Sequence, residues 1–384
     1  MGGGGHAARH VLDRRRPARP HRHAAGCRAG GGDLTGQIGL FEQPAPRRRS
    51  ASAGEVLPAG DSPLLRAPPL PPEIRLGTSS WFFPGWRGLV YEGLHPQPAL
   101  SKRGLAAYAQ IPLLRTVSLD RTFYAPLTAL EYARYASQVP EAFSFVVKAP
   151  ALVCDAVVRD EEGRGRVPNQ HFLDPAIAAR EFMVPCLEGL GHKAGPLVFQ
   201  VSPLPRALVE EAPLLVERLA AFFAALPREL GRLKPIYALE LRNGELLTPR
   251  LMRMLREAGV RYCVGLHDRM PEVERQETAL QALDGDSPGD LVVRWNLHRG
   301  FLYRAAQQRY DPFDRLVDED PETRRILARM AAAAFKAGRR VWITANNKAE
   351  GCAPLTVLKL AEEIAAALGT AGTDGTVGHV PLRD

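Results

Sequence analysis

An acidic and a basic residue stand two positions apart at the end of one apolar run, at Glu240 and Arg242. Because side chains alternate along a strand, both would point to the same side of it. A carboxylate beside a guanidinium can act on a substrate, or the two can form a structural ion pair. A buried ion pair is costly to retain, so we predict Glu240 as a general base or acid and Arg242 as a substrate-binding residue.

Asp268 and His298 are the counterparts we expect for Glu240, because each follows another apolar run. Histidine and carboxylate side chains transfer protons near neutral pH, and they also bind metal ions. Neither His267 nor His298 belongs to a local pair such as H-x-x-x-H, the kind of spacing typical of zinc sites. A divalent metal held by Glu240, Asp268 and His298 is therefore a minor alternative, and we assign no metal ligand.

Lys148 ends the apolar stretch that begins at Phe143. A desolvated lysine can act as a base, form a Schiff base or bind an anion. We predict that Lys148 contacts an anion or substrate, and the alternative is a strand-end lysine that reaches solvent. Further substrate contacts are expected from residues at other strand ends, namely Thr78, Trp81, Tyr124, Gln200, Asn346 and Asn347.

Four aromatic residues follow the first apolar run, at Trp81, Phe82, Phe83 and Trp86. They would either close the site as part of the core or form a wall on which a sugar or a base stacks. Both interpretations place these rings beside the polar residues named above.

Eight short apolar runs would position these side chains. The runs are Ile74–Ser79, Thr116–Leu119, Phe143–Val147, Leu197–Val201, Ile236–Leu241, Arg261–Leu266, Leu291–Leu297 and Val341–Ala345. Between them lie stretches with helix signals, such as the capping box of Thr128 and Glu131 and the helix start at Thr248-Pro249. Strand–helix alternation repeated eight times predicts an α/β fold, a single (β/α)8 TIM-type barrel. The alternative, an open doubly wound sheet, lacks the Gly-x-Gly-x-x-Gly expected after its first strand, so no nucleotide-cofactor motif is found there.

The working site of such a barrel lies where the strands end and the following loops begin. The polar residues named above stand at these ends, whereas the strand starts are mostly apolar. This one-sided distribution predicts an enzyme that acts on a small polar or anionic substrate at the C-terminal mouth of the barrel. Hydrolase, isomerase and lyase chemistry all stay open, and so does the cofactor.

The chain divides by composition into a barrel, residues 74–369, and two tails. Residues 1–73 are rich in Gly, Pro and Arg and are predicted to be a disordered basic tail, and residues 370–384 a flexible C-terminal tail. Residues 1–50 hold ten Arg against three acidic residues, 10 − 3 = +7, out of a formal net charge of +8 for the chain. The barrel is therefore nearly neutral, so the basic charge of the chain is only weak evidence that the barrel binds nucleic acid.

The five cysteines are widely spaced, odd in number and without a C-x-x-C pair. This pattern argues against a disulfide framework or a structural zinc site and favours a reducing, cytoplasmic location. No apolar run approaches the roughly 20 residues that a membrane-spanning helix needs, so we expect no membrane association.

Six collinear segments resemble the domain-of-unknown-function 72 (YecE-like) family. They are Gly77-Thr-Ser-Ser-Trp81 with Trp86-Arg-Gly88, Thr122-Phe-Tyr124, Phe143-x-Phe145-x-x-Lys148-x-Pro150, Gly195-Pro-Leu-Val-Phe-Gln200, Ala238-Leu-Glu-Leu-Arg242, and Asn346-Asn347 with Gly351 and Ala353-Pro354. The resemblance implies a (β/α)8 barrel, but no reaction, since the activity of the family is not established.

Two segments depart from the family pattern. The family usually has V-E-x-N-x-T-F-Y, whereas here Ser118 replaces the acid and Asp120 replaces the asparagine. The family more often has R-x-H-G where this chain has His298 followed by an additional Arg299. If the missing acid is catalytic in the family, this protein has a different chemistry or none.

Within the N-terminal tail, Gln37, Leu40 and Phe41 resemble the Q-x-x-L-F peptide by which bacterial DNA-maintenance proteins bind the sliding clamp. Such a peptide would bury its two apolar side chains in a groove of the partner. The alternative function is therefore a DNA-maintenance accessory or nucleic-acid-processing protein tethered to the clamp. A chance pair of apolar residues in a linker would give the same pattern.

Overall fold

The structure, a computed structural model, describes residues 55–159 and 165–369. The predicted clamp-binding residues Gln37, Leu40 and Phe41, and the predicted C-terminal tail, lie outside the described residues. Among the residues that are described, no helix is long and apolar enough to span a membrane.

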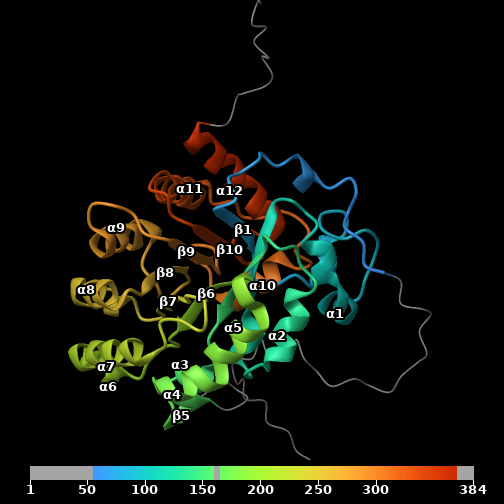
Figure 1. The fold of residues 1–384 in the computed structure, drawn as a ribbon. Coiled ribbons are helices and arrows are strands. Elements are labelled where there is room, and N and C mark those ends of the chain that lie inside the picture. Colours follow the sequence, from blue (N-terminus) through green and yellow to red (C-terminus); the bar gives the residue numbers. More distant parts are fainter. Residues whose placement is uncertain (1–54, 160–164, 370–384) are drawn as a thin grey trace, which may run out of the picture.

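Eight parallel strands form a closed barrel in the order β1-β10-β9-β8-β7-β6-β3-β2. Figure 1 shows the strands at the centre of the molecule with the helices around them. The strands are β1 (Ile74–Thr78), β2 (Leu114–Leu119), β3 (Ser144–Lys148), β6 (Ala194–Gln200), β7 (Ile236–Glu240), β8 (Arg261–Leu266), β9 (Leu291–Trp295) and β10 (Val341–Ala345). All eight predicted strands and the predicted barrel are confirmed, with ends that shift by at most three residues.

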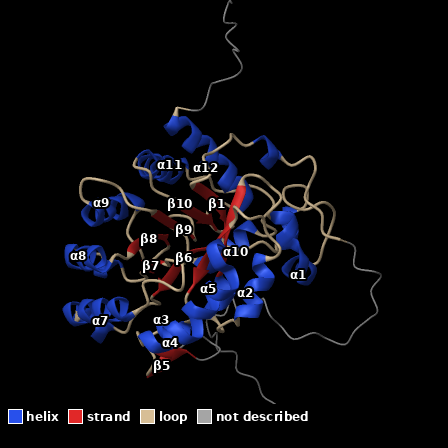
Figure 2. Ribbon diagram, viewed as in Figure 1, coloured by secondary structure: helices blue, strands red, loops and turns tan. Residues whose placement is uncertain are grey.

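Helices connect successive barrel strands and cover the outside of the sheet (Figure 2). The helices are α1 (Gln97–Tyr108), α2 (Ala129–Ala136), α3 (Ala151–Cys154), α4 (Pro175–Ala178), α5 (Val184–Leu190), α6 (Arg206–Glu210), α7 (Ala212–Ala225), α8 (Pro249–Ala258), α9 (Val273–Asp284), α10 (Tyr303–Tyr310), α11 (Pro321–Lys336) and α12 (Ala353–Leu368). The predicted starts of α2 and α8 are confirmed: Thr128 and Glu131 form a capping box, and Thr248 Oγ1 accepts from the Leu251 N–H.

Two features of the chain connections were not predicted. A two-stranded antiparallel sheet, β4 (Val157–Arg159) and β5 (Gly165–Pro168), follows β3. Between β9 and α11 the chain forms the additional helix α10, and its residues reach the barrel mouth. Both features lie in long connections between a strand and the following helix. The length of such a connection does not predict which secondary structure it contains.

The segment 55–73 corrects the predicted start of the folded domain. The composition predicts a tail up to residue 73, but this segment packs onto the barrel, where Val56 and Leu64 belong to the main hydrophobic core. Ser62 caps a 3-10 turn by accepting from the Leu64 N–H at 3.1 Å. The apolar residues of this segment have no regular period, so periodicity could not reveal that they are buried.

Candidate active site

The inside of the barrel is arranged in two layers that follow from strand alternation. An apolar layer is formed by Val146, Val198, Ala238, Cys263, Val292 and Trp342. Two residues further along four of these strands stand polar or charged residues, namely Lys148, Gln200, Glu240 and Arg294. Because residues i and i+2 share one face of a strand, the polar layer lies above the apolar one, toward the C-terminal mouth.

Arg294 on β9 is the centre of the polar layer. Its Nη1 donates to Glu240 Oε2 at 2.6 Å, and its Nη2 lies 2.7 Å from both carboxylate oxygens of Asp120. The other oxygen of Glu240, Oε1, lies 2.7 Å from Arg242 Nη2, which also donates to Gln200 Oε1 at 3.0 Å. The predicted pair of Glu240 and Arg242 therefore exists, and Arg294 extends it to the end of β2.

The network fixes the charge state of its members. Burial raises the pKa of Glu240, but Arg242 and Arg294 outweigh burial and hold this pKa below its ordinary value. Burial lowers the pKa of Arg294, and Asp120 and Glu240 more than compensate, so its guanidinium stays protonated. Since each charge has a counter-charge within hydrogen-bond distance, the network can persist although it is removed from water.

Lys148 lies beside this network. Its Nζ is 3.5 Å from the centre of the Phe123 ring, and burial lowers its pKa to about 8. Asp120 partly opposes that shift. Lys148 therefore contributes a positive charge that an aromatic face and nearby carboxylates stabilise.

A cavity of about 390 Å³ opens above the polar layer. Its volume is at the lower end of the range typical of small-molecule sites. Polar lining comes from the C-terminal ends of β1, β2 and β10 and the residues that follow them, namely Ser79, Ser118, Asp120, Asn346 and Lys348. Aromatic lining comes from the β1 loop, from the segments around α2 and from the α10 region, namely Trp81, Phe82, Phe83, Tyr124, Tyr135, Tyr303 and Phe313.

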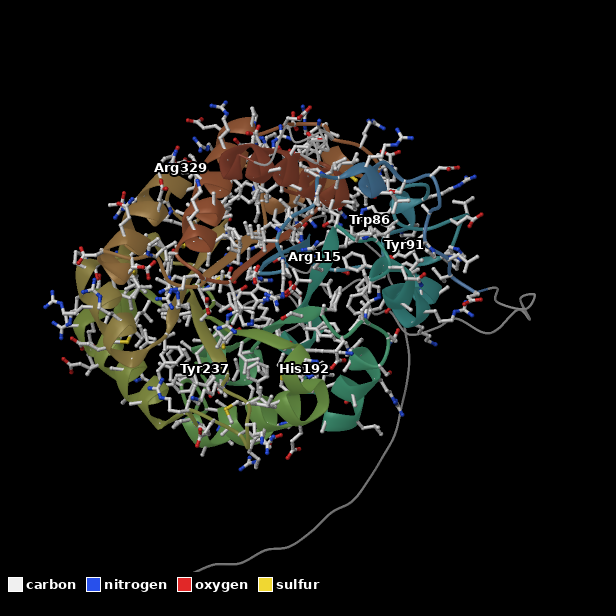
Figure 3. All side chains as sticks on the ribbon, turned by 45° about the horizontal axis from the view of Figure 1, so that its top comes forward. Trp86, Tyr91, Arg115, His192, Tyr237 and Arg329 are labelled. Atoms are coloured by element: carbon white, nitrogen blue, oxygen red, sulfur yellow. The ribbon has the colours of Figure 1, made fainter. Side chains whose placement is uncertain are left out.

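Only part of the predicted site lines this cavity. Trp81, Tyr124 and Asn346 do, whereas Lys148, Gln200, Glu240 and Arg242 are absent from its lining and belong to the network described above. Thr78 and Asn347 instead form hydrogen bonds with the side chains of buried aromatic residues. Thr78 Oγ1 lies 2.9 Å from the Tyr108 hydroxyl, and Asn347 Oδ1 accepts from Trp86 Nε1 at 3.1 Å. Figure 3 shows Trp86 inside the molecular outline, consistent with its complete burial.

Asp268 and His298 line a second, smaller pocket of about 70 Å³, whose lining residues differ from those of the larger cavity. There His267 Nδ1 contacts Asp268 Oδ1, and burial together with Arg242 lowers the pKa of His267 to about 4, so the imidazole is neutral near pH 7. His298 Nδ1 lies 2.7 Å from the Arg299 carbonyl oxygen. The structure thus brings Asp268 and His298 together, but it does not bring them to Glu240. Within residues 55–159 and 165–369, no three His, Cys, Asp or Glu side chains are grouped to hold a metal ion.

Comparison with protein families decides where this barrel belongs. A family model described as protein of unknown function DUF72 matches residues 75–376. The chain belongs to the DUF72 family.

Two solved DUF72 structures are similar to this chain. A DUF72 family protein from Thermotoga maritima is 21% identical, with a TM-score of 0.51, covering 75% of this chain and 98% of that one. A DUF72 family protein from Enterococcus faecalis is 18% identical, with a TM-score of 0.48, covering 76% of this chain and 95% of that one. A comparison with curated proteins finds no match. The likeness to the Thermotoga protein supports the fold of this DUF72 protein and carries no reaction to it.

Arg294 is one of three site residues of this DUF72 protein that the sequence did not single out, together with Asp120 and Lys348. It stands inside the apolar run Leu291–Trp295, two positions after Val292. A charged residue on the inward face of a barrel strand was therefore visible from alternation alone. Gly265 gave a further signal: a Cβ there would lie 3.3 Å from Glu240, so a glycine leaves room for the network.

Gly85 shapes the roof of the cavity, and we expect its replacement by alanine to disturb that roof. A Cβ at Gly85 would lie 1.9 Å from the Pro312 carbonyl oxygen, so the β1 loop and the segment after α10 must move apart. We expect Gly85→Ala to lower the free energy of unfolding by about 1–3 kcal/mol, measured by chemical denaturation. Gly60→Ala, where a Cβ meets nothing within 4 Å, is the control. Equal stability of both variants would contradict this account of the roof.

Proposed function

We propose that this DUF72 protein is an enzyme that acts on a small polar substrate in the cavity at the C-terminal mouth of the barrel. The observation that carries the proposal is the position of Asp120. Its carboxylate lines a cavity with aromatic walls, and the buried Arg294 holds that carboxylate in place. Binding sites for small molecules combine such apolar walls with a few fixed polar groups.

The hydrogen bonds of Asp120 leave it free capacity toward the cavity. Its Oδ1 accepts from Ser118 Oγ at 2.6 Å and from Arg294 Nη2 at 2.7 Å, and its Oδ2 accepts from the same Nη2 at 2.7 Å. A carboxylate offers about four acceptor positions, so Oδ2 can accept a further hydrogen bond. The side chain is 22% exposed, in contrast to Glu240 at 0%. A substrate hydroxyl could therefore bind Oδ2 and exchange a proton with it.

Glu240 takes a different part in this proposal from the one that its sequence position suggested. Both of its oxygens contact arginines, and none of its surface is exposed. We assign it the role of holding Arg294, which in turn orients Asp120. Asp268 and His298 open onto the smaller pocket, so Asp120 is the preferred acid–base group. Proton transfer at a hydroxyl is common to hydrolases, isomerases and lyases, and the proposal covers all three.

The test is substrate depletion from a bacterial small-molecule extract, followed by mass spectrometry. We expect the full chain to consume at least one compound and Asp120→Asn to consume it more slowly by on the order of 100-fold, the loss typical of a general acid or base. Asp314→Asn, which changes an exposed acid outside the lining of this cavity, should keep the wild-type rate. Full turnover by Asp120→Asn, or no depletion by the wild type, would refute the proposal.

A further inference from the structure

Lys348 is a nearly buried cation that faces the cavity. It follows β10, and its backbone is fixed because its N–H donates to Asn346 Oδ1 at 3.0 Å and its carbonyl oxygen accepts from the His298 N–H at 2.8 Å. The residue is 6% exposed and lines the cavity. The ammonium is thus held at the cavity wall by a rigid stretch of backbone.

The contacts of the Lys348 ammonium are aromatic. Its Nζ lies 4.1 Å from the centre of the Tyr303 ring and 5.6 Å from the centre of the Phe313 ring. Within the described part of the chain, no carboxylate lies within 4.0 Å of it. Burial lowers its pKa to about 8, and no charged neighbour contributes to that shift. Aromatic faces stabilise a cation only partly when water is removed.

Three other buried cations among the described residues have carboxylate partners. Arg242 and Arg294 pair with Glu240, and Arg324 pairs with Glu319 at 2.7 Å. Lys148 also lacks an ion pair, but Asp120 and Glu240 act on its pKa, and it does not line the cavity. Lys348 is therefore the nearly buried cation that both faces the cavity and lacks a counter-charge among the described residues.

We propose that Lys348 binds an anionic group of the substrate, a phosphate or a carboxylate, while the rest of the substrate packs against the aromatic walls. This inference rests on the proposed function, because it names the substrate class of the same cavity. The anionic group of the ligand supplies a counter-charge for the ammonium. Binding is therefore favoured, because it pairs a buried charge that is unpaired in the free protein. The sequence had suggested Lys148 and Arg242 for this task, and the proposal assigns it to Lys348 instead.

The substrate is expected to contact Asp120 and Lys348 from the same side. Asn346, whose Nδ2 donates to Ser79 Oγ at 2.8 Å, lines the cavity between the β1 and β10 ends and offers further polar contacts. A substrate with an anionic group at Lys348 would present its hydroxyl groups to the remaining polar wall, where Asp120 lies. This arrangement matches a compact polar compound with one charged end, such as a phosphorylated or carboxylated sugar-like molecule.

The experiment is calorimetric titration of the full chain with inorganic phosphate and, separately, with acetate. We expect the wild type to bind at least one of them, and which one binds separates the two sources of anion. Lys348→Met should weaken that binding at least tenfold, whereas Lys348→Arg, which keeps the charge, should retain it. Lys359→Met, which removes an exposed lysine on α12, is the matched control and should bind as the wild type does.

Equal binding by Lys348→Met and the wild type, or no binding of either anion to the wild type, would overturn the inference. Should Lys348→Met fail to fold, Lys348→Gln provides the same comparison. The inference and the proposed function fail separately. If anion binding depends on Lys348 but no substrate is turned over, the anion site is supported and the proposed enzymatic function is refuted. If only uncharged compounds are turned over, the enzymatic function is supported and the anion site is refuted.

Discussion

Replacing Arg294 with methionine is expected to lower the free energy of unfolding by about 3–5 kcal/mol, the range typical for breaking a buried ion pair from one side. Arg294 is 2% exposed and neutralises Glu240 and Asp120 at 2.6 and 2.7 Å. Without it, Arg242 is left as the sole arginine partner of Glu240, and the carboxylate of Asp120 loses its guanidinium. Chemical denaturation, followed by circular dichroism, would measure the loss.

A control variant and a double-mutant cycle test whether the loss of stability comes from the buried network. Arg329→Met breaks an exposed pair with Glu277 of the same 2.6 Å length, on the outer rim of the molecule (Figure 3), and should change stability by less than about 1 kcal/mol. In a double-mutant cycle, Arg294→Met combined with Glu240→Gln should cost at least about 1 kcal/mol less than the sum of the two changes. If Arg294→Met is as mild as Arg329→Met, the network does not stabilise the barrel.

The fold was predictable because its signals are local. Each barrel strand is a short apolar run, and helix caps such as Thr128 and Thr248 mark where the following helix begins. The ends of the strands shifted because hydrogen bonding across the sheet, and not hydrophobicity, decides where a strand starts. Ala194 illustrates this: β6 begins there, three residues before the predicted start, through its pairing with Phe145 on β3.

The charged network was predictable only where its residues stand close together in the sequence. Alternation placed Glu240 and Arg242 on one face, and the structure pairs them at 2.7 Å. The contacts of Arg294 with Glu240 and Asp120 join β9 to β7 and to the end of β2, residues far apart in sequence that closure of the barrel brings together. No spacing rule contains that information. The aromatic contacts of Lys348 with α10 were hidden for the same reason.

The departures from the family pattern at Ser118 and Asp120 acquire a physical meaning in the structure. Both residues line the cavity, and Ser118 Oγ donates to Asp120 Oδ1 at 2.6 Å. The family pattern has its acid at the position of Ser118, whereas this chain has its acid two residues later. In this chain a carboxylate at the end of β2, held by Arg294, therefore lines the cavity. Asp120 is for this reason the first residue to test.

Lys348→Met is expected to stabilise the protein by up to about 3 kcal/mol near pH 7, although the same change should weaken anion binding at least tenfold. Burial lowers the pKa of Lys348 from 10.5 to about 8, and a shift of this size corresponds to a charge-burial cost of about 3 kcal/mol. Methionine fills similar space without a charge, so this cost disappears. Lys348 destabilises the free protein and lines the cavity. A residue with both properties is expected where ligand binding, and not stability, requires it.

The stabilisation should depend on pH with a definite sign. Below pH 8 the ammonium is charged in both the folded and the unfolded chain, so the full burial cost lowers the stability of the wild type. Between pH 8 and 10.5 the folded chain has released the proton while the unfolded chain still holds it, so the wild type gains stability as the pH rises. The advantage of Lys348→Met should therefore be largest below pH 8 and shrink toward pH 10.5.

Comparing the wild type with Lys348→Met isolates the effect of Lys348. The similarly lowered pKa of Lys148 is present in both proteins, so its contribution to the pH dependence cancels. The titratable side chain in contact with the ammonium is Tyr303, and the charged residues lining the same cavity are Asp120, Arg121 and Asp311, none of which contributes to the shift. Lys359→Met should show no such pH-dependent gain, since its lysine is exposed. A Lys348→Met variant that is less stable than the wild type at pH 7 would mean that the ammonium already has a sufficient partner in the free protein, and the anion site would then lose its physical basis.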